Sequence, residues 1–352
     1  MTRDKIIAIG VVVLGGLGLL VYRQAKRDES LGAPAPTIKE LPSINAPADI
    51  DKISITNGDK GEVLFEKVVD PNPGDASAEA GPPMIWVMTK PLNAPLNQGT
   101  IKDIVANLED IKVDSEIYLT LDDSVRKDKQ LDAAHGVHVV AWRGSDKKLD
   151  DVFGKSGPAG QLVTVGSKPD QVWAAKDYKS YLYTKEPKDF RNKEILKFED
   201  NTVSRVTVTN SSGTFSFTKG DKWAATRSKK PLAGFDEEKL KDMLRSWKSL
   251  NADDFGDGKS AADVGLNKPE ATVSIELADG AGAFTVLVGG TASGTNRWAK
   301  RSSDDTIFQI ASYMADWALT DGSKFLASDD AGAGAGDGGS KVKPGPAGAK
   351  KK

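Results

Sequence analysis

The sequence contains no cysteine, and only two of its 352 residues are histidine. The absence of cysteine excludes disulfides, thiolate metal sites, cysteine nucleophiles and lipid attachment through a thiol. It leaves the compartment open, because a chain without cysteine folds equally well in reducing and in oxidising surroundings. With two histidines, the chain also has little material for general acid-base or metal chemistry.

Charge of either sign is not in excess. The chain has 48 lysines and arginines against 50 aspartates and glutamates, a net charge of -2. Proteins that bind nucleic acids need a basic surface to displace counterions from the phosphates. The composition therefore argues against a nucleic-acid partner.

A long hydrophobic run lies at the N-terminus. Ile6 to Tyr22 carries no charge and is flanked by Lys5 and Arg23. As a helix rising about 1.5 Å per residue, the run nearly spans a hydrocarbon core of roughly 30 Å. A cleaved signal peptide is the competing interpretation, but basic residues follow directly, where a small-x-small cleavage site is typical. We expect an uncleaved single-pass anchor within residues 1–27.

Composition divides the rest of the chain. Residues 28–48 are rich in proline and small polar residues, which predicts a semi-extended spacer. Residues 328–352 are mostly glycine, alanine, aspartate and lysine, so they cannot offset the entropy of ordering and are expected to be disordered. Between these segments we expect two copies of one unit, residues 49–198 and residues 199–327.

The copies become visible when the two halves are compared. Each opens with an alternating strand, Asp51 to Asn57 and Ser204 to Asn210. A second strand, a strand with Trp86 or Trp223, and a Pro-Leu pair follow, and an amphipathic helix comes next. The apolar faces of the two helices are Ile101, Ile104, Val105 and Leu108, and Leu240, Met243, Leu244 and Trp247.

The back halves match in spacing. At one common offset, Trp173, Tyr178 and Phe190 recur as Phe308, Tyr313 and Phe325. The expected strand pairs are Val137 to Trp142 with Leu162 to Val165, and Thr272 to Leu277 with Phe284 to Val288. The predicted fold class is α+β: one N-terminal transmembrane helix, then two tandem repeats of a mostly antiparallel sheet with one main amphipathic helix each.

Candidate metal and nucleophile sites are weak. His135 and His138 lie three positions apart next to a predicted strand, where such positions point to opposite faces, so a shared metal ion is not expected. Gly144-Ser145 is not part of a G-x-S-x-G motif and is predicted to be a turn after a strand. Neither pair of residues indicates catalysis.

Two loops resemble known binding loops only in part. Asn251 to Gly258 has the start of a calcium-loop pattern, but Phe255 replaces an oxygen ligand and Val264 replaces the bidentate glutamate. We expect a solvated turn there. Gly289-Gly290 with Gly294 follows a strand but lacks the Lys-Ser/Thr pair of a phosphate-binding loop, which predicts a hairpin turn with glycine at positive φ.

The two strand tryptophans have two interpretations. Trp86 and Trp223 could form an aromatic platform for sugars or bases, but a tryptophan at the same place in each copy is explained more simply by a core. No residue is assigned as catalytic, cofactor-binding or metal-binding, no cofactor is expected, and the chain is predicted not to be an enzyme.

The order of motifs resembles the DUF4340 family of bacterial envelope proteins. The segments that carry this resemblance are Ala261 to Leu277, with GLNKP at Gly265 to Pro269, then VLVGG at Val286 to Gly290, TIFQIASYMADWAL at Thr306 to Leu319, and KFL at Lys324 to Leu326. In the first half, HGVHVVAW lacks the expected Leu and Pro, whereas FRNKEIL at Phe190 to Leu196 resembles the charged terminal element. The resemblance covers about residues 49–327 and transfers no catalytic residue.

The resemblance implies a location and a role. Family members carry one N-terminal membrane helix with the body outside the cytoplasm, often beside an ABC transporter and a gliding-motility-like component. It therefore implies an envelope accessory or scaffold at the inner membrane with a periplasmic body and protein partners, although basic residues flanking the anchor weakly favour the cytoplasm. A module for an extracytoplasmic ligand is the second expectation, and a hydrolase with an unrecognised site is the third.

Overall fold

The computed structural model describes residues 41–71 and 82–327, which form two compact units that divide between Arg191 and Asn192. The sequence places this boundary between residues 198 and 199. Strand β10 (Glu194–Lys197) already pairs within the second unit, with β15 (Ser249–Asn251).

The predicted anchor and tail lie outside the described residues. Within residues 41–71 and 82–327, none of the helices is long and apolar enough to cross a membrane. Ile6 to Tyr22 is not among those residues, so the anchor stays a prediction.

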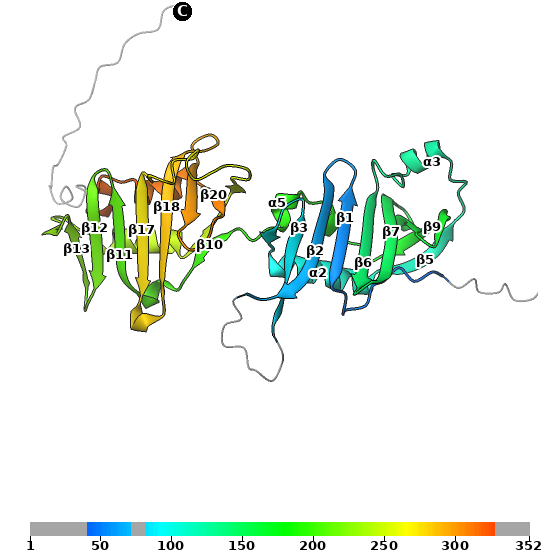
Figure 1. Cartoon of the computed structure of the whole chain (residues 1–352), viewed down its shortest axis with the longest axis horizontal. Coiled ribbons are helices and arrows are strands. Elements are labelled where there is room, and N and C mark those ends of the chain that lie inside the picture. Colours follow the sequence, from blue (N-terminus) through cyan, green and yellow to red (C-terminus); the bar gives the residue numbers. More distant parts are fainter. Residues whose placement is uncertain (1–40, 72–81, 328–352) are drawn as a thin grey trace, which may run out of the picture. The chain divides into compact units, whose positions relative to one another are not determined.

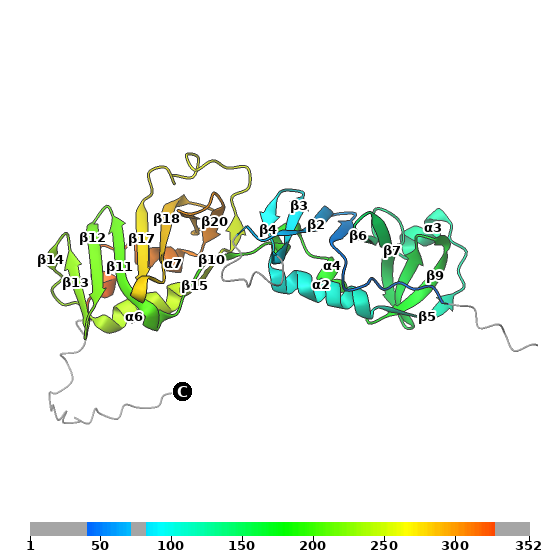
Figure 2. The same ribbon diagram turned by 60° about the horizontal axis from the view of Figure 1, so that its bottom comes forward.

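The first unit is a nine-stranded antiparallel sheet with its main helix, α2, along one face (Figures 1 and 2). In sheet order, its strands are β4 (Ala94–Pro95), β3 (Met84–Lys90), β2 (Gly61–Val69), β1 (Lys52–Asn57), β6 (Val137–Arg143), β7 (Asp146–Gly157), β8 (Gly160–Val165), β9 (Lys168–Lys176) and β5 (Lys112–Ile117). Its helices are α2 (Gln98–Asp110), α3 (Asp123–Asp128), α4 (Ser180–Tyr183) and α5 (Pro187–Phe190).

Helix α2 is fixed by a cap and an apolar face. The Asn97 side chain accepts a hydrogen bond from a backbone N–H of the first turn at 3.1 Å, which satisfies a donor that the helix leaves free. Ile101, Ile104 and Leu108 are buried in the core, and Val105 is partly buried against it, so the predicted face is confirmed.

The second unit is a second nine-stranded antiparallel sheet, with α6 along one face (Figure 2). In sheet order, its strands are β14 (Lys230–Pro231), β13 (Trp223–Arg227), β12 (Gly213–Lys219), β11 (Val203–Asn210), β17 (Ala271–Leu277), β18 (Ala283–Thr291), β19 (Arg297–Arg301), β20 (Ile307–Ile310) and β16 (Asp254–Phe255). Its helices are α6 (Glu237–Trp247), α7 (Ser312–Ala318) and the 3-10 turns η2 (Asp200–Thr202), η3 (Ala278–Gly280) and η4 (Ser323–Phe325).

Helix α6, like α2, has a side-chain cap at its N-terminus and a buried apolar face. The Asp236 carboxylate caps it by accepting a hydrogen bond from the Glu238 N–H at 2.9 Å. All four predicted apolar residues are buried, and fully burying such a side chain stabilises a fold by about 1.5 to 3 kcal/mol. These residues are Leu240, Met243, Leu244 and Trp247.

The two units share more than strand order. At the end of the first strand of each, an asparagine side chain donates to a carbonyl at the end of a short helix: Asn57 to Tyr183 at 2.7 Å, and Asn210 to Ala318 at 2.8 Å. In each unit the residue that caps the main helix also donates its backbone N–H to a phenylalanine carbonyl near the C-terminal end of the unit, both at 2.9 Å. These pairs are Asn97 with Phe190, and Asp236 with Phe325.

The aromatic correspondence holds for two of its three pairs. Trp173 and Phe308 are buried on equivalent strands, and Phe190 and Phe325 are buried as well. The third pair is wrong: Tyr178 stacks on Phe153 and Tyr183, with ring centroids 4.0 and 4.8 Å apart, whereas Tyr313 is 62% exposed. Equal spacing therefore did not give equal burial there.

The predicted pairing of Val137 to Trp142 with Leu162 to Val165 is also wrong. Strand β7 lies between these two segments and pairs with both β6 and β8. Its charged residues interrupt the apolar alternation that marks a strand. In the second unit the predicted pair, β17 with β18, is confirmed.

The GLNKP and VGG motifs contact each other. The Gly290 N–H donates to the Val264 carbonyl at 3.0 Å, and a Cβ on Gly289 would lie 2.4 Å from that oxygen. The first unit makes the same contact: Lys155 N–H donates to the Lys129 carbonyl at 2.8 Å, next to Gly154. Leu131 lies against Gly154 as Leu266 lies against Gly289. The expected leucine is therefore present in the first half, although it comes before HGVHVVAW.

We expect Gly289→Ala to lower the free energy of unfolding of the second unit by about 1 to 3 kcal/mol, because the added methyl overlaps a backbone oxygen. Gly290→Ala is the matched control, since its Cβ would lie 3.7 Å from the same oxygen, an ordinary contact. Urea unfolding of both variants measures the difference. Equal stability of the two would contradict the close approach.

Candidate binding site

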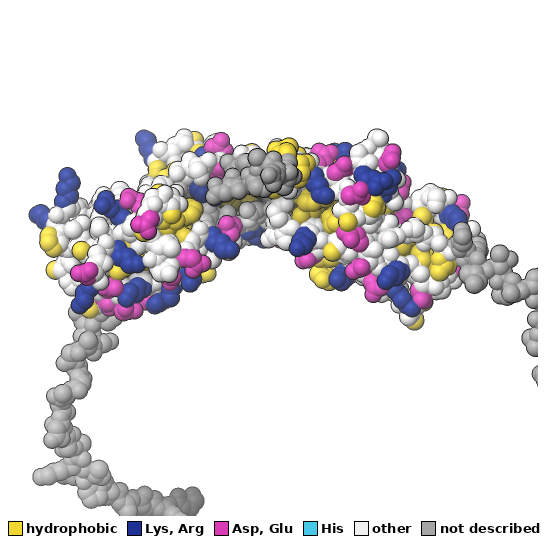
Figure 3. Space-filling model, turned by 90° about the horizontal axis from the view of Figure 1, so that it is seen from below, with side chains coloured by type: hydrophobic (Ala, Val, Ile, Leu, Met, Phe, Trp, Pro, Cys, Tyr) yellow, Lys and Arg dark blue, Asp and Glu magenta, His cyan; other side chains and the backbone are white. Residues whose placement is uncertain are grey.

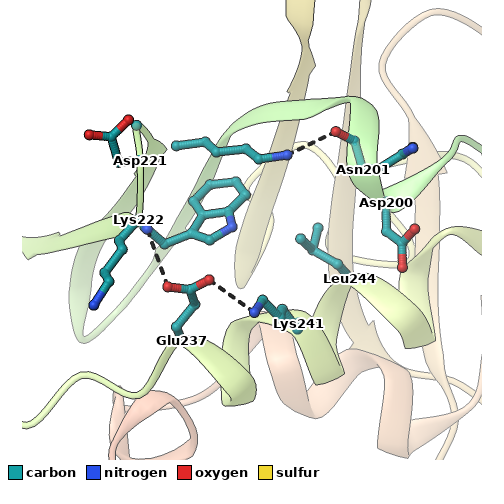
Figure 4. A pocket seen from close by; sticks show the side chains of 10 residues that line it. Asp200, Asn201, Asp221, Lys222, Glu237, Lys241 and Leu244 are labelled. Atoms are coloured by element: carbon teal, nitrogen blue, oxygen red, sulfur yellow. Dashed lines mark hydrogen bonds and ion pairs between the residues drawn. The ribbon is translucent and has the colours of Figure 1, made fainter.

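A cavity of about 390 Å³ lies beside β13 and the start of α6 in the second unit (Figure 4). Polar and charged side chains surround the single aromatic residue that lines it. The lining includes Asp200, Asn201, Lys219, Asp221, Lys222, Trp223, Glu237, Lys241 and Leu244. Its size suits a small molecule or a short piece of a larger partner.

Hydrogen bonds hold the walls of the cavity. The Lys219 ammonium donates to the Asn201 carbonyl at 2.8 Å. The Trp223 backbone N–H lies 3.4 Å from Glu237 Oε2, and Lys241 pairs with Oε1 of the same carboxylate at 3.0 Å (Figure 4). Glu237 therefore connects the strand to the helix.

Glu237 is an acceptor rather than an acid. Hydrogen bonding to Lys241 lowers the pKa of the Glu237 carboxyl, and its hydrogen bonds to Glu238 and Glu237 raise the pKa of Lys241. Both groups are held in their charged forms near neutral pH. The cavity therefore offers hydrogen-bond acceptors and fixed charges instead of a group poised to transfer a proton.

At the same place in the first unit, a side chain hydrogen-bonds to the backbone of the strand. The Gln98 side chain accepts a hydrogen bond from the Trp86 N–H at 3.0 Å and donates to the Trp86 carbonyl at 2.8 Å. The Lys67 ammonium lies 5.1 Å from the Trp86 ring centroid. Gln98 and Glu237 are both the first residue of their helix, so at this position the first unit has an amide and the second unit has a carboxylate.

Both strand tryptophans are nearly buried. Trp86 is 8% and Trp223 is 9% exposed, and each belongs to the core of its unit. The core interpretation therefore holds for both, and Trp223 lines the cavity in addition.

The two histidines are kept apart. His135 lies before β6 and pairs through Nδ1 with Asp132 at 2.8 Å, and His138 lies in β6 and pairs through Nε2 with Asp150 at 2.7 Å. In the described part of the chain, no three acidic or histidine side chains come together in a way that could hold a metal ion. Gly144-Ser145 forms the turn between β6 and β7, as predicted.

The acidic loop differs from the expected solvated turn. Phe255 is only 8% exposed and pairs with Phe308 as part of the edge strand β16. The Asp253 carboxylate accepts a hydrogen bond from the Asn296 side chain at 2.9 Å. Phe255 thus belongs to a short, partly buried strand, which the surrounding acidic residues made hard to predict.

The glycine-rich loop is a turn only in part. Gly289 and Gly290 belong to strand β18, and neither has a positive φ. Gly294, in the connection to β19, has φ +60, so the expectation holds there alone. The close contact with the GLNKP loop explains the glycine at position 289.

No motif in the sequence singles out Gln98 or Glu237. Only their position could have indicated them. Each is the first residue of the helix that follows the Trp-bearing strand, directly after the capping residue. Figure 3 shows lysine, arginine, aspartate and glutamate side chains interspersed on the face in view of each unit. Overall charge therefore does not point to the site.

A family model described as "Domain of unknown function (DUF4340)" matches residues 86–269, more than half of the chain. The match starts at Trp86 in the first unit and ends at Pro269, after GLNKP in the second. Comparisons with curated proteins and with solved structures found no match. The chain belongs to the DUF4340 family.

Proposed function

We propose that this chain is a non-catalytic envelope accessory or scaffold protein, tethered to the inner membrane by Ile6 to Tyr22, with a periplasmic body. Its partners are subunits of an ABC-type transporter or a gliding-motility-like assembly. The cavity at Trp223 carries the binding part of this proposal. Its carboxylate, Glu237, is held ionised by Lys241, which suits recognition of a partner better than proton transfer.

We also propose that the chain contains two tandem copies of the DUF4340 domain. The common strand order supports this, as do the matched hydrogen bonds of Asn57 with Asn210 and of Asn97 with Asp236. The two copies differ at the strand edge beside their tryptophan, which suits a scaffold. The edge at Trp223 can bind a partner, whereas Gln98 already occupies the edge at Trp86.

A module for a small extracytoplasmic ligand is the second candidate. The cavity volume of about 390 Å³ favours it. Copurification of a small molecule in the absence of protein partners would favour this module over the scaffold.

The tether is tested by membrane fractionation. We expect the full-length chain to sediment with membranes and to resist extraction by salt and carbonate, since the uncharged run is long enough to insert. Protease added to spheroplasts should digest the body. Release by salt, or protection of the body while the inner membrane is intact, would contradict the proposed topology.

A further inference from the structure

The edge of strand β13 at Trp223 is open. In β13 the Ala225 carbonyl accepts from the Leu232 N–H at 3.0 Å, on the side away from β12. Backbone groups two residues apart in a strand point to the same side, so Trp223 also presents its N–H and C=O on that side. Strand β14 pairs with Thr226 and Arg227 and does not reach Trp223.

Only half of this edge has a partner within the unit. The Trp223 N–H has the Glu237 carboxylate at 3.4 Å, a long contact for a hydrogen bond. Among the described residues, none donates a hydrogen bond to the Trp223 carbonyl. An ionised carboxylate cannot supply that donor, because it only accepts hydrogen bonds.

In the first unit, a side chain completes the equivalent edge at Trp86. There the Gln98 carboxamide gives one acceptor to the Trp86 N–H at 3.0 Å and one donor to the Trp86 carbonyl at 2.8 Å. One amide therefore satisfies both backbone groups, as a neighbouring strand would. In the second unit this position is Glu237, which lines the cavity.

We propose that the edge at Trp223 binds a secondary amide of an extended peptide segment from a partner protein. The peptide N–H donates to the Trp223 carbonyl, and the peptide lies extended in the cavity beside the first residue of β13. This inference rests on the proposed binding function and names the chemistry that its site takes. An N-acetylated sugar carries the same amide, but a backbone edge with one donor and one acceptor matches the alternating groups of a peptide.

The test uses the full chain in detergent micelles with its tryptophans replaced by 5-fluorotryptophan. Seven fluorine signals are expected, one for each tryptophan, and single Trp→Phe variants identify those of Trp223 and Trp86. N-acetylglycine N-methylamide is the peptide probe. N-acetylsarcosine N,N-dimethylamide, which has no N–H, is the matched control probe, and N-acetylglucosamine represents the sugar.

We expect the peptide probe to shift the Trp223 signal saturably and to leave the Trp86 signal unchanged. Glu237→Gln should weaken binding about tenfold, because the new amide completes the edge as Gln98 does and competes for one hydrogen bond of about 1 to 1.5 kcal/mol. Gln98→Glu should make the Trp86 signal respond. Both substitutions preserve side-chain shape, and unchanged signals of the remaining tryptophans show that each variant is folded.

Four results would overturn the proposal: no saturable shift at Trp223, equal binding of the probe without N–H, equal binding by Glu237→Gln, or tighter binding of the sugar than of the peptide probe. The proposed function fails separately, if native membranes yield no protein partner. Undiminished partner recovery with Glu237→Gln would refute this site and leave the proposed function standing.

Discussion

Replacing Trp247 by alanine is expected to lower the free energy of unfolding of the second unit by about 3 to 5 kcal/mol. Trp247 has no exposed surface and packs in the core on the sheet-facing side of α6. Its indole Nε1 also donates to the Met314 carbonyl at 3.2 Å, which ties α6 to α7. The substitution leaves a large cavity and removes the donor to that carbonyl.

Urea unfolding of the full chain, followed by hydrogen exchange in α6, measures this loss. Trp247→Phe is the graded control, because it keeps most of the apolar volume and should cost less than the alanine variant. A loss below about 1 kcal/mol for alanine, far under the range for a buried large aromatic, would show that Trp247 does not anchor the second core.

Ionisation of Asp151 is expected to lower the stability of the first unit by roughly 3 kcal/mol as the pH rises from about 4 to about 7. Burial, with a smaller contribution from the neighbouring Asp150, raises the pKa of the Asp151 carboxyl from 3.8 to about 7, although a backbone hydrogen bond from Gly166 acts to lower it. Asp151 is 2% exposed, and its Oδ2 has no hydrogen-bond partner among residues 41–71 and 82–327. In register it lies between Val139 and Val165.

The sign follows from the raised pKa. Below the ordinary value of 3.8 the carboxyl is protonated in both the folded and the unfolded chain, so the stabilisation is complete. As the pH rises, the unfolded chain ionises first, and the advantage is lost once the folded carboxyl ionises as well, near pH 7.

Asp151→Asn should abolish this pH dependence, because an amide does not titrate in this range. Asp59→Asn, at an exposed aspartate in the turn between β1 and β2, should preserve it. Hydrogen exchange of β7 over the same pH range measures the first unit alone. A wild-type unit equally stable at both ends of the range would contradict the assignment.

Periodic apolar residues made the main elements predictable. The faces of α2 and α6 follow from residues three and four apart, and β1 and β11 follow from strict alternation with valine, isoleucine and threonine. These signals are local, so a single sequence contains them. The order of the elements then indicated the repeat.

What could not be predicted depends on long-range contacts. Strand β7 carries Asp151 on its buried side, where the second unit has Val286 paired with Val273. A carboxyl at a buried position breaks the alternation of apolar and polar residues by which a strand is predicted. The open edge at Trp223 depends on the side of β13 to which the backbone N–H and C=O of this residue point. It also depends on the contact of the Glu237 carboxylate with the Trp223 N–H. Residue spacing alone predicts neither.

Crosslinking in native membranes, followed by purification of the full-length chain, tests the proposed role most directly. We expect recovery of subunits of a transporter or of another envelope assembly, crosslinked through the body of the chain. Recovery of no protein partner, together with a small molecule bound to the purified chain or turnover of a substrate, would contradict it.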